Sequence, residues 1–235
     1  VIFMEVARER CASPDFIRHV RRVATQKKIV LIFDECTSGF RSNFGGYHLL
    51  TGVEPDLAVF GKALGNGYAI TGVIGSDEVM EQAQSSFISS TFWSERTGFA
   101  AGLATLEYME KYQTWKRVVD HGVFFKKVIK QLFDEHNLHV DFCESNVAIT
   151  YSFLGLSANL DQMLRMLICQ KMLEKGYLFS NLFYPSISHT ASEIKRFSIQ
   201  LGRTLSEIDV YDDELYLRSL IKGRLPDSGF ARLVK

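Results

Sequence analysis

Residues 28–35 read Lys28-Ile29-Val30-Leu31-Ile32-Phe33-Asp34-Glu35, an apolar run that ends in two acids. A continuous apolar run of this length is typical of a strand that is buried on both faces, as in a parallel sheet. Upstream, Ser13-Pro14-Asp15 predicts the start of a helix over residues 13–27, with Ser13 as its N-cap and Pro14 in its first turn. Residues 1–6 predict another buried strand. Strand, helix and strand at this spacing form a βαβ unit, so this segment predicts an α/β fold.

The rest of the chain falls into two parts with different patterns. Up to residue 114, short apolar segments such as residues 57–60 alternate with helical segments, and glycines follow the strands. Residues 115–135 then predict one long amphipathic helix, followed by a smaller α/β unit. We therefore predict two domains, residues 1–114 and residues 115–235. Within the second domain, we expect a strand over residues 177–183 and a helix over residues 206–221 with Ser206 as its N-cap.

Composition excludes several classes of protein. The 235 residues carry 27 Lys+Arg and 27 Asp+Glu, so the net charge is zero, which argues against a nucleic-acid or anionic-membrane partner. No apolar run approaches the ~20 residues that a membrane-spanning helix needs. The four cysteines are scattered without a C-x-x-C pair, which favours reduced thiols and a cytoplasmic protein. His136 and His139 lack an evident third ligand, so no metal site is predicted.

The acid pair Asp34-Glu35 follows a buried strand, and the carboxyl ends of such strands are where open α/β folds bind ligands. One interpretation is the Walker B element of an NTPase, in which the acids serve Mg²⁺ and water. That interpretation requires a G-x-x-x-x-G-K-[ST] loop, and Gly61-Lys62 is followed by Ala63 instead. The alternative is that Asp34 only caps the next turn.

Lys62 is the second unusual position, because it follows the apolar segment 57–60 and is flanked by glycines. A lysine at a partly desolvated strand end can act as an amine nucleophile, although a lysine extending into solvent beside a turn would look the same in sequence. Asp34 and Lys62 lie 28 residues apart, and parallel pairing can bring both to one edge of the sheet. A buried acid and a nucleophilic lysine are what pyridoxal 5′-phosphate (PLP) requires of a protein.

These segments resemble the class III PLP-dependent aminotransferases, and among them most of all the glutamate-1-semialdehyde 2,1-aminomutase group. The resemblance runs from residue 1 to about residue 190. It rests on four stretches, which are Asp34-Glu35-Cys36-Thr37-Ser38-Gly39-Phe40-Arg41, Pro55-Asp56-Leu57, Gly61-Lys62-Ala63-Leu64-Gly65-Asn66-Gly67 and residues 89–107, which begin Ser89-Ser90-Thr91-Phe92-Trp93.

The resemblance implies a fold and a set of roles. The fold is the fold-type I PLP-transferase architecture, a mainly parallel sheet with flanking helices plus a small α/β C-terminal domain. Lys62 would form the Schiff base and move protons, Asp34 would pair with the pyridine nitrogen, Cys36 would pack on the cofactor ring, and Thr91 would bind the phosphate in the neighbouring subunit's site. The implied activity is amino-group transfer, or its return to another carbon as in an aminomutase, on a small amino, keto or amino-aldehyde substrate in a homodimer with shared active sites.

Three departures from the family pattern bear on these roles. Cys36 stands where valine is usual, and Asn66 interrupts a run that is usually glycine. The N-terminal phosphate loop and ring-stacking aromatic of the family have no counterpart, so we expect the sequence to be part of a longer protein. A catalytically incomplete fragment or dimerisation module that needs an upstream segment is therefore the alternative hypothesis. Phe92-Trp93 favours a subunit interface, and Arg41 could meet either a substrate carboxylate or a structural acid.

Overall fold

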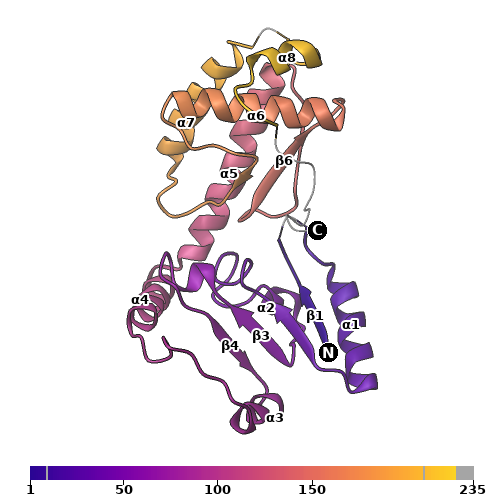
Figure 1. The fold of residues 1–235 in the computed structure, drawn as a ribbon, viewed down its shortest axis with the longest axis vertical. Helices are drawn as coiled ribbons and strands as arrows, with labels where there is room; N and C mark the ends of the chain where they lie inside the picture. The colour runs from indigo at the N-terminus through magenta and orange to yellow at the C-terminus, as the bar shows by residue number, and fades with distance from the viewer. Residues whose placement is uncertain (9, 209, 226–235) are drawn as a thin grey trace. The chain divides into compact units, whose positions relative to one another are not determined.

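The computed structural model describes residues 1–8, 10–208 and 210–225 (Figure 1). The chain divides into two compact units. Unit 1 consists of Val1–Val123, Cys143–Ile149 and Tyr184–Ser188, and unit 2 of Phe124–Phe142, Thr150–Phe183 and the described residues from His189 onward. Helix α5 (Thr114–Glu135) contributes residues to both units, while the domain division after residue 114 stays a prediction.

Unit 1 is built on a four-stranded sheet in the order β1-β2-β3-β4, from Ile2–Glu5, Leu31–Asp34, Leu57–Phe60 and Gly72–Gly75. The first three strands are parallel, and β4 runs antiparallel to β3. The helical segments of this unit, beside the first part of α5, are α1 (Pro14–Lys27), α2 (His48–Thr51), η1 (Lys62–Leu64), α3 (Asp77–Met80), η2 (Glu81–Ser85) and α4 (Thr97–Tyr112).

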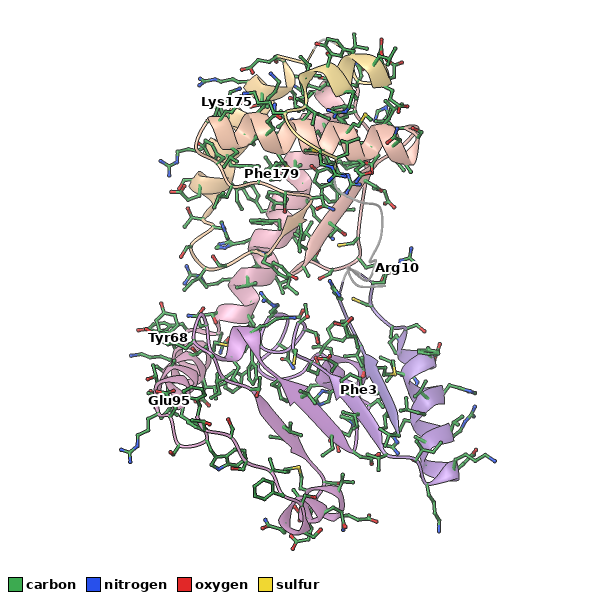
Figure 2. All side chains as sticks on the ribbon, viewed as in Figure 1. Phe3, Arg10, Tyr68, Glu95, Lys175 and Phe179 are labelled. Carbon is green, nitrogen blue, oxygen red and sulfur yellow. The ribbon has the colours of Figure 1, made fainter. Side chains whose placement is uncertain are left out.

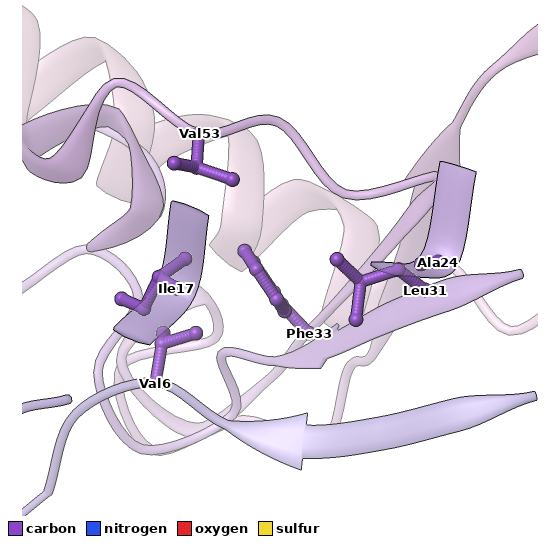
Figure 3. Packing of buried hydrophobic residues seen from close by; sticks show 6 residues of the cluster. All are labelled: Val6, Ile17, Ala24, Leu31, Phe33 and Val53. Atoms are coloured by element: carbon purple, nitrogen blue, oxygen red, sulfur yellow. The ribbon is translucent and has the colours of Figure 1, made fainter. Parts of the chain in front are cut away.

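Helix α1 begins and ends as the sequence predicts. The Ser13 hydroxyl accepts a hydrogen bond from the Phe16 N–H, Pro14 occupies the first turn, and Lys28 ends the helix in the left-handed conformation. Figure 3 shows the core that this helix makes with β2, a cluster formed by Val6, Ile17, Ala24, Leu31, Phe33 and Val53. The cluster fixes β2 in the sheet and thereby positions the acids that follow it.

Strand β1 shows the alternation of a strand with one covered face. Ile2 and Met4 pack against this core, whereas Phe3, labelled in Figure 2, is 59% exposed. In the sheet order β1 pairs on one side only, with β2.

Unit 2 combines a small sheet with three helices. Strands β5 (Val140–Phe142), β6 (Ile149–Phe153) and β7 (Leu182–Phe183) form a sheet in that order, and β5 and β6 are antiparallel. Helices α6 (Ala158–Glu174), α7 (Ala191–Leu205) and α8 (Glu214–Leu220) accompany the second part of α5. The core of the unit includes Phe133, Leu164, Leu167, Ile168, Met172, Leu201 and Leu205, all of which are fully buried.

The predicted helix over residues 206–221 is wrong in its extent and its cap. Ser206 ends α7, because its hydroxyl donates to the Gly202 carbonyl instead of accepting from a following N–H. The helix that follows is only α8, and its N-cap is Asp213, whose carboxylate accepts from the Tyr216 N–H.

The strand expected over residues 177–183 is also shorter than predicted, because only Leu182–Phe183 pairs as β7. The Ser180 hydroxyl both accepts from the Leu182 N–H and donates to the Leu182 carbonyl. Such local side-chain bonds compete with the bonds of a sheet ladder.

The described part of the chain contains no helix that is long and apolar enough to cross a membrane. Within those same residues, no group of three histidine, cysteine or acidic side chains is arranged to hold a metal ion.

The Tyr151 hydroxyl is buried with no hydrogen-bond partner among the described residues, and burial raises the pKa of this phenol. Its ring packs against Phe133 and Phe153. We expect Tyr151→Phe to raise the free energy of unfolding by about 1 kcal/mol, because it removes a desolvated hydroxyl that gains nothing in return. Urea unfolding measures the difference.

Tyr211→Phe is the matched control for this prediction. The Tyr211 hydroxyl donates to the Leu205 carbonyl at 3.0 Å, so its removal should lower the free energy of unfolding. A loss of stability in Tyr151→Phe equal to that of the control would contradict the prediction.

Candidate active site

The site lies at the carboxyl edge of the unit 1 sheet. Asp34 is the last residue of β2 and stands opposite Val59 of the parallel strand β3. Lys62 follows the end of β3 by two residues, and between them a Cβ built on Gly61 would lie 3.7 Å from the Cys36 Sγ atom. The structure therefore brings Asp34, Cys36 and Lys62 to one edge, as the parallel pairing predicts.

Lys62 has an unusual backbone conformation for a residue with a side chain. Its φ angle is +44°, in the left-handed region, at the first position of η1. A non-glycine residue in this region costs about 1–2 kcal/mol and persists only where its surroundings enforce it. The Lys62 ammonium donates to the Thr37 hydroxyl at 2.6 Å. Thr37 is 5% exposed, so it fixes the lysine from a buried position.

Thr37 is a residue of the site that the sequence does not predict. It lies in the polar glycine-rich segment after β2, where its type and spacing carry no signal that separates it from its neighbours. Only the fold of that segment places its hydroxyl against Lys62.

The Asp34 carboxylate is oriented by the backbone that follows it. Its Oδ1 atom accepts from the Cys36 N–H at 2.9 Å, which is the local bond expected of an Asx turn. No lysine, arginine or histidine among the described residues pairs with this carboxylate. Asp34 is thus held in place while its charge remains available to a cationic group.

Cys36 is a neutral thiol in this environment. Burial raises the pKa of the Cys36 thiol, and the hydrogen bond and negative charge of Asp34 raise it further, whereas the charge of Lys62 offsets only part of the shift. The side chain can therefore fill space as valine would, and it is not activated as a nucleophile.

The remaining predicted residue, Thr91, lies apart from this group. It is exposed in the turn over residues 91–94 that precedes α4, and no contact in the described part of the chain joins it to Asp34, Cys36 or Lys62. Its predicted role in a neighbouring subunit's site stays a prediction.

Glu35, the other acid of the pair, is fully buried and holds the segment after β2. Its carboxylate accepts from the Tyr47 N–H at 3.0 Å, from the His48 N–H and Nδ1 at 2.9 Å each, and from the Ser38 hydroxyl. Burial alone raises the pKa of Glu35, but the bonds from His48, Ser38 and the two backbone N–H groups outweigh it and hold the pKa below its usual value. Glu35 is therefore a positioning residue for the segment that carries Thr37.

We expect Glu35→Gln to lower the free energy of unfolding by about 2–3 kcal/mol at pH 7, because the amide cannot accept all of these bonds. Because the folded-state pKa is lowered, the carboxylate stabilises the protein above its unfolded pKa, and that contribution is lost as the pH falls through the folded pKa. Urea unfolding from pH 7 to pH 3 should therefore show a weaker acid-side loss in Glu35→Gln than in the wild type.

Glu81→Gln is the control for this measurement, because Glu81 is exposed. It should leave both the stability at pH 7 and the pH dependence unchanged. An acid-side loss in Glu35→Gln as steep as in the wild type would show that other carboxylates dominate the pH dependence.

The loop after Lys62 explains the departure at Asn66. A Cβ on Gly65 would lie 2.1 Å from the Tyr68 carbonyl oxygen, so this position requires glycine. Asn66 has φ of +46° and Gly67 of +105°. Asparagine tolerates the left-handed region better than other side chains, so it can replace glycine at this point of the turn.

Comparison with known proteins shows to which family the chain belongs. The family model for class III aminotransferases matches residues 9–182, which is most of the chain. The chain belongs to the class III aminotransferases. The resemblance read from its motifs is thereby confirmed, and the match includes the Lys62 segment and the Asp34 segment.

Two curated class III relatives indicate the range of the similarity. The chain is 39% identical over 131 residues to a 3-aminobutyryl-CoA aminotransferase of Cloacimonas acidaminovorans, which covers 55% of this chain and 32% of that protein. It is 29% identical over 133 residues to a glutamate-1-semialdehyde 2,1-aminomutase of Methanosarcina acetivorans, covering 55% of this chain and 31% of the relative. The chain thus spans about a third of the length of these two relatives.

A solved structure confirms the fold of this chain. The PLP internal aldimine form of the FumI protein from Sphingopyxis sp. MTA144 superposes with a TM-score of 0.81 at 20% identity, covering 88% of this chain and 51% of that one. The predicted fold-type I transferase architecture, with its mainly parallel sheet and flanking helices, is therefore correct.

Proposed function

We propose that this chain carries the lysine and the acid of a PLP-dependent amino-transfer site. The observation that carries the proposal is the juxtaposition at the carboxyl edge. Lys62, whose backbone is left-handed and whose ammonium bonds to Thr37, lies there beside an Asp34 carboxylate that has no cationic partner among the described residues. Backbone strain of this kind is typical of functional residues.

The residues at this edge fit the cofactor that the family uses. Asp34 offers an uncompensated carboxylate to a protonated ring nitrogen, and Cys36 offers a neutral, valine-sized surface beside it. When bound, PLP withdraws electrons from the carbon that carries the amino group.

The roles of the chain's own side chains follow from these positions. Lys62 would hold the cofactor covalently through its Nζ atom and would carry the proton to and from the substrate carbon. Asp34 would keep the ring nitrogen protonated through a charge-assisted hydrogen bond. Cys36 would pack against the ring, and Thr91 would bind the phosphate in the site of a second subunit.

We extend the proposal to two reaction outcomes that use the same residues. The amino group is passed to a second molecule in an aminotransferase, and to another carbon of the same molecule in an aminomutase. The printed names of the relatives include both activities. The substrate is in either case a small amino, keto or amino-aldehyde compound.

The test is an amine-donor screen on the full-length protein. Candidate amines are paired with keto acids, and separately amino-aldehydes are supplied alone, with products identified by chromatography and mass spectrometry. Transfer between two molecules supports the aminotransferase, and conversion of a single amino-aldehyde supports the aminomutase. The absence of both refutes the proposed activity.

A second candidate is that the chain is a catalytically incomplete fragment or dimerisation module that acts only with an upstream segment. The coverage of about a third of the relatives' length supports it. Running the same screen on residues 1–235 alone separates the two, because only a self-sufficient site turns over without the upstream segment.

We also propose that the protein is a cytoplasmic homodimer whose interface includes residues 87–93. This segment of unit 1 exposes large apolar side chains, among them Phe87 at 97%, Phe92 at 76% and Trp93 at 64%. Clustered exposed aromatic residues are typical of subunit interfaces. All four cysteines are free thiols, which fits a reducing compartment.

We expect the double variant Phe92→Asp/Trp93→Asp of the full-length protein to shift from dimer to monomer, because two carboxylates would have to be buried in the interface. Sedimentation velocity measures the change. Leu178→Asp is the control, because Leu178 is 93% exposed and belongs to unit 2. A dimer that persists in the double variant would place the interface elsewhere.

A further inference from the structure

Arg41 is a largely buried cation without a counter-charge. Its Nε atom donates to the Thr37 carbonyl at 2.8 Å, and its guanidinium carbon lies 4.5 Å from the centre of the Tyr184 ring. Burial lowers the pKa of this guanidinium. No carboxylate of the described residues forms an ion pair with Arg41. Nε is the nitrogen of Arg41 that bonds within the described part of the chain, so the terminal nitrogens of its fork are open to solvent or to a ligand.

Arg41 also lines a cavity of about 510 Å³ within unit 1. Ala101 and Thr105 of α4 contribute to its wall, as do Trp115 of α5 and Tyr68, which is labelled in Figure 2. Arg41 is the one charged residue in the lining, whose other members are apolar or neutral. A volume of this size accommodates a small organic molecule.

We propose that this cavity binds a small organic acid, whose carboxylate is held by the terminal nitrogens of Arg41 and whose apolar body lies against the alanine and aromatic walls. The planar guanidinium fork matches a carboxylate bidentately. A phosphate dianion carries two negative charges and would call for a second cation, whereas Arg41 is the one cation of this lining. The proposal goes beyond the amino-transfer reaction, because it depends only on Arg41 and the cavity.

The proposed site is connected to Lys62 through a single residue. The Thr37 carbonyl accepts from Arg41, and the Thr37 hydroxyl accepts from Lys62. An organic acid bound to Arg41 would therefore lie one residue away from Lys62, because Thr37 bonds to both side chains.

The test is isothermal titration calorimetry of the full-length protein with glutarate and with its uncharged analogue glutaramide. Wild type should bind glutarate, and Arg41→Gln should bind it at least tenfold more weakly. Arg41→Lys should give an intermediate affinity, because it keeps the charge and loses the fork. Glutaramide should bind no more tightly to wild type than to Arg41→Gln. Equal glutarate affinity in wild type and Arg41→Gln overturns the proposal.

A second pair of variants tests the cavity while leaving Arg41 intact. The proposal can then be tested even if Arg41→Gln fails to fold. Ala101→Leu should weaken glutarate binding by filling the cavity, whereas Ala100→Leu, on the same helix outside the lining, should not. Unchanged binding in Ala101→Leu overturns the proposal. If wild type does not bind glutarate and Arg41→Gln instead dissociates the dimer, Arg41 pairs with a carboxylate of a second copy and the small-molecule site is refuted.

Discussion

Replacing Lys62 with alanine is expected to lower amino transfer by the full-length protein by about 10⁴-fold, since a positioned proton-transfer group contributes up to that much. In the wild type, borohydride should fix the cofactor on a lysine, and peptide mass spectrometry should find the label on Lys62. The same treatment of Lys62→Ala should leave that peptide unlabelled.

Lys28→Ala is a closely matched control. Lys28 is also a lysine in the left-handed region, with φ of +52°, and it is exposed at the end of α1. Its replacement removes the same charge from the same kind of backbone conformation without touching the carboxyl edge. Turnover should be unchanged. A label on a lysine other than Lys62 in the wild type would refute the assignment.

The second large effect is expected for Asp34→Asn, which should slow turnover by at least about a thousandfold, or roughly 4 kcal/mol of transition-state stabilisation. The amide oxygen can still accept from the Cys36 N–H, so the turn after β2 should be preserved. The lost element is the negative charge that keeps a ring nitrogen protonated. Rapid-quench measurement of the single-turnover rate tests this directly.

Asp56→Asn serves as the contrasting variant. Asp56 accepts from the Leu31 N–H at 2.6 Å and pairs with Arg21 at 3.0 Å, just before the start of β3 and so at the opposite edge of the sheet. The Asp56→Asn variant should have a lower free energy of unfolding, but its folded fraction should turn over at the wild-type rate. If Asp34→Asn turns over at nearly the wild-type rate, another group must protonate the ring.

The local sequence was sufficient to predict the elements that depend on neighbouring residues alone. Ser13 and Pro14 define the start of α1, and the apolar run before Asp34 defines a strand of the parallel sheet, because capping and burial depend on neighbouring residues. The carboxyl-edge juxtaposition of Asp34 and Lys62 followed from parallel pairing alone.

The errors and omissions arise where a polar side chain has several partners to choose from. Ser206 has the residue type of an N-cap, but its hydroxyl bonds backwards to Gly202 and ends a helix. Glu35 acquires its role from the segment after β2, which returns and brings the His48 ring to it, and Thr37 acquires its role from the end of β3, which brings the Lys62 ammonium to it. The spacing of residues along the sequence does not predict these tertiary contacts.

The left-handed backbone of Lys62 has a consequence for how this chain tolerates change over evolutionary time. Glycine adopts φ of +44° without steric cost, so selection for folding alone favours glycine at position 62 by about 1–2 kcal/mol. Lys28 shows that a lysine can bear this cost at a helix end without any chemistry, but at position 62 the proposed reaction adds a reason to keep the lysine, an instance of activity maintained against stability. A homologous chain with glycine at this position would therefore be the signature of a lineage that has kept the scaffold and abandoned the reaction.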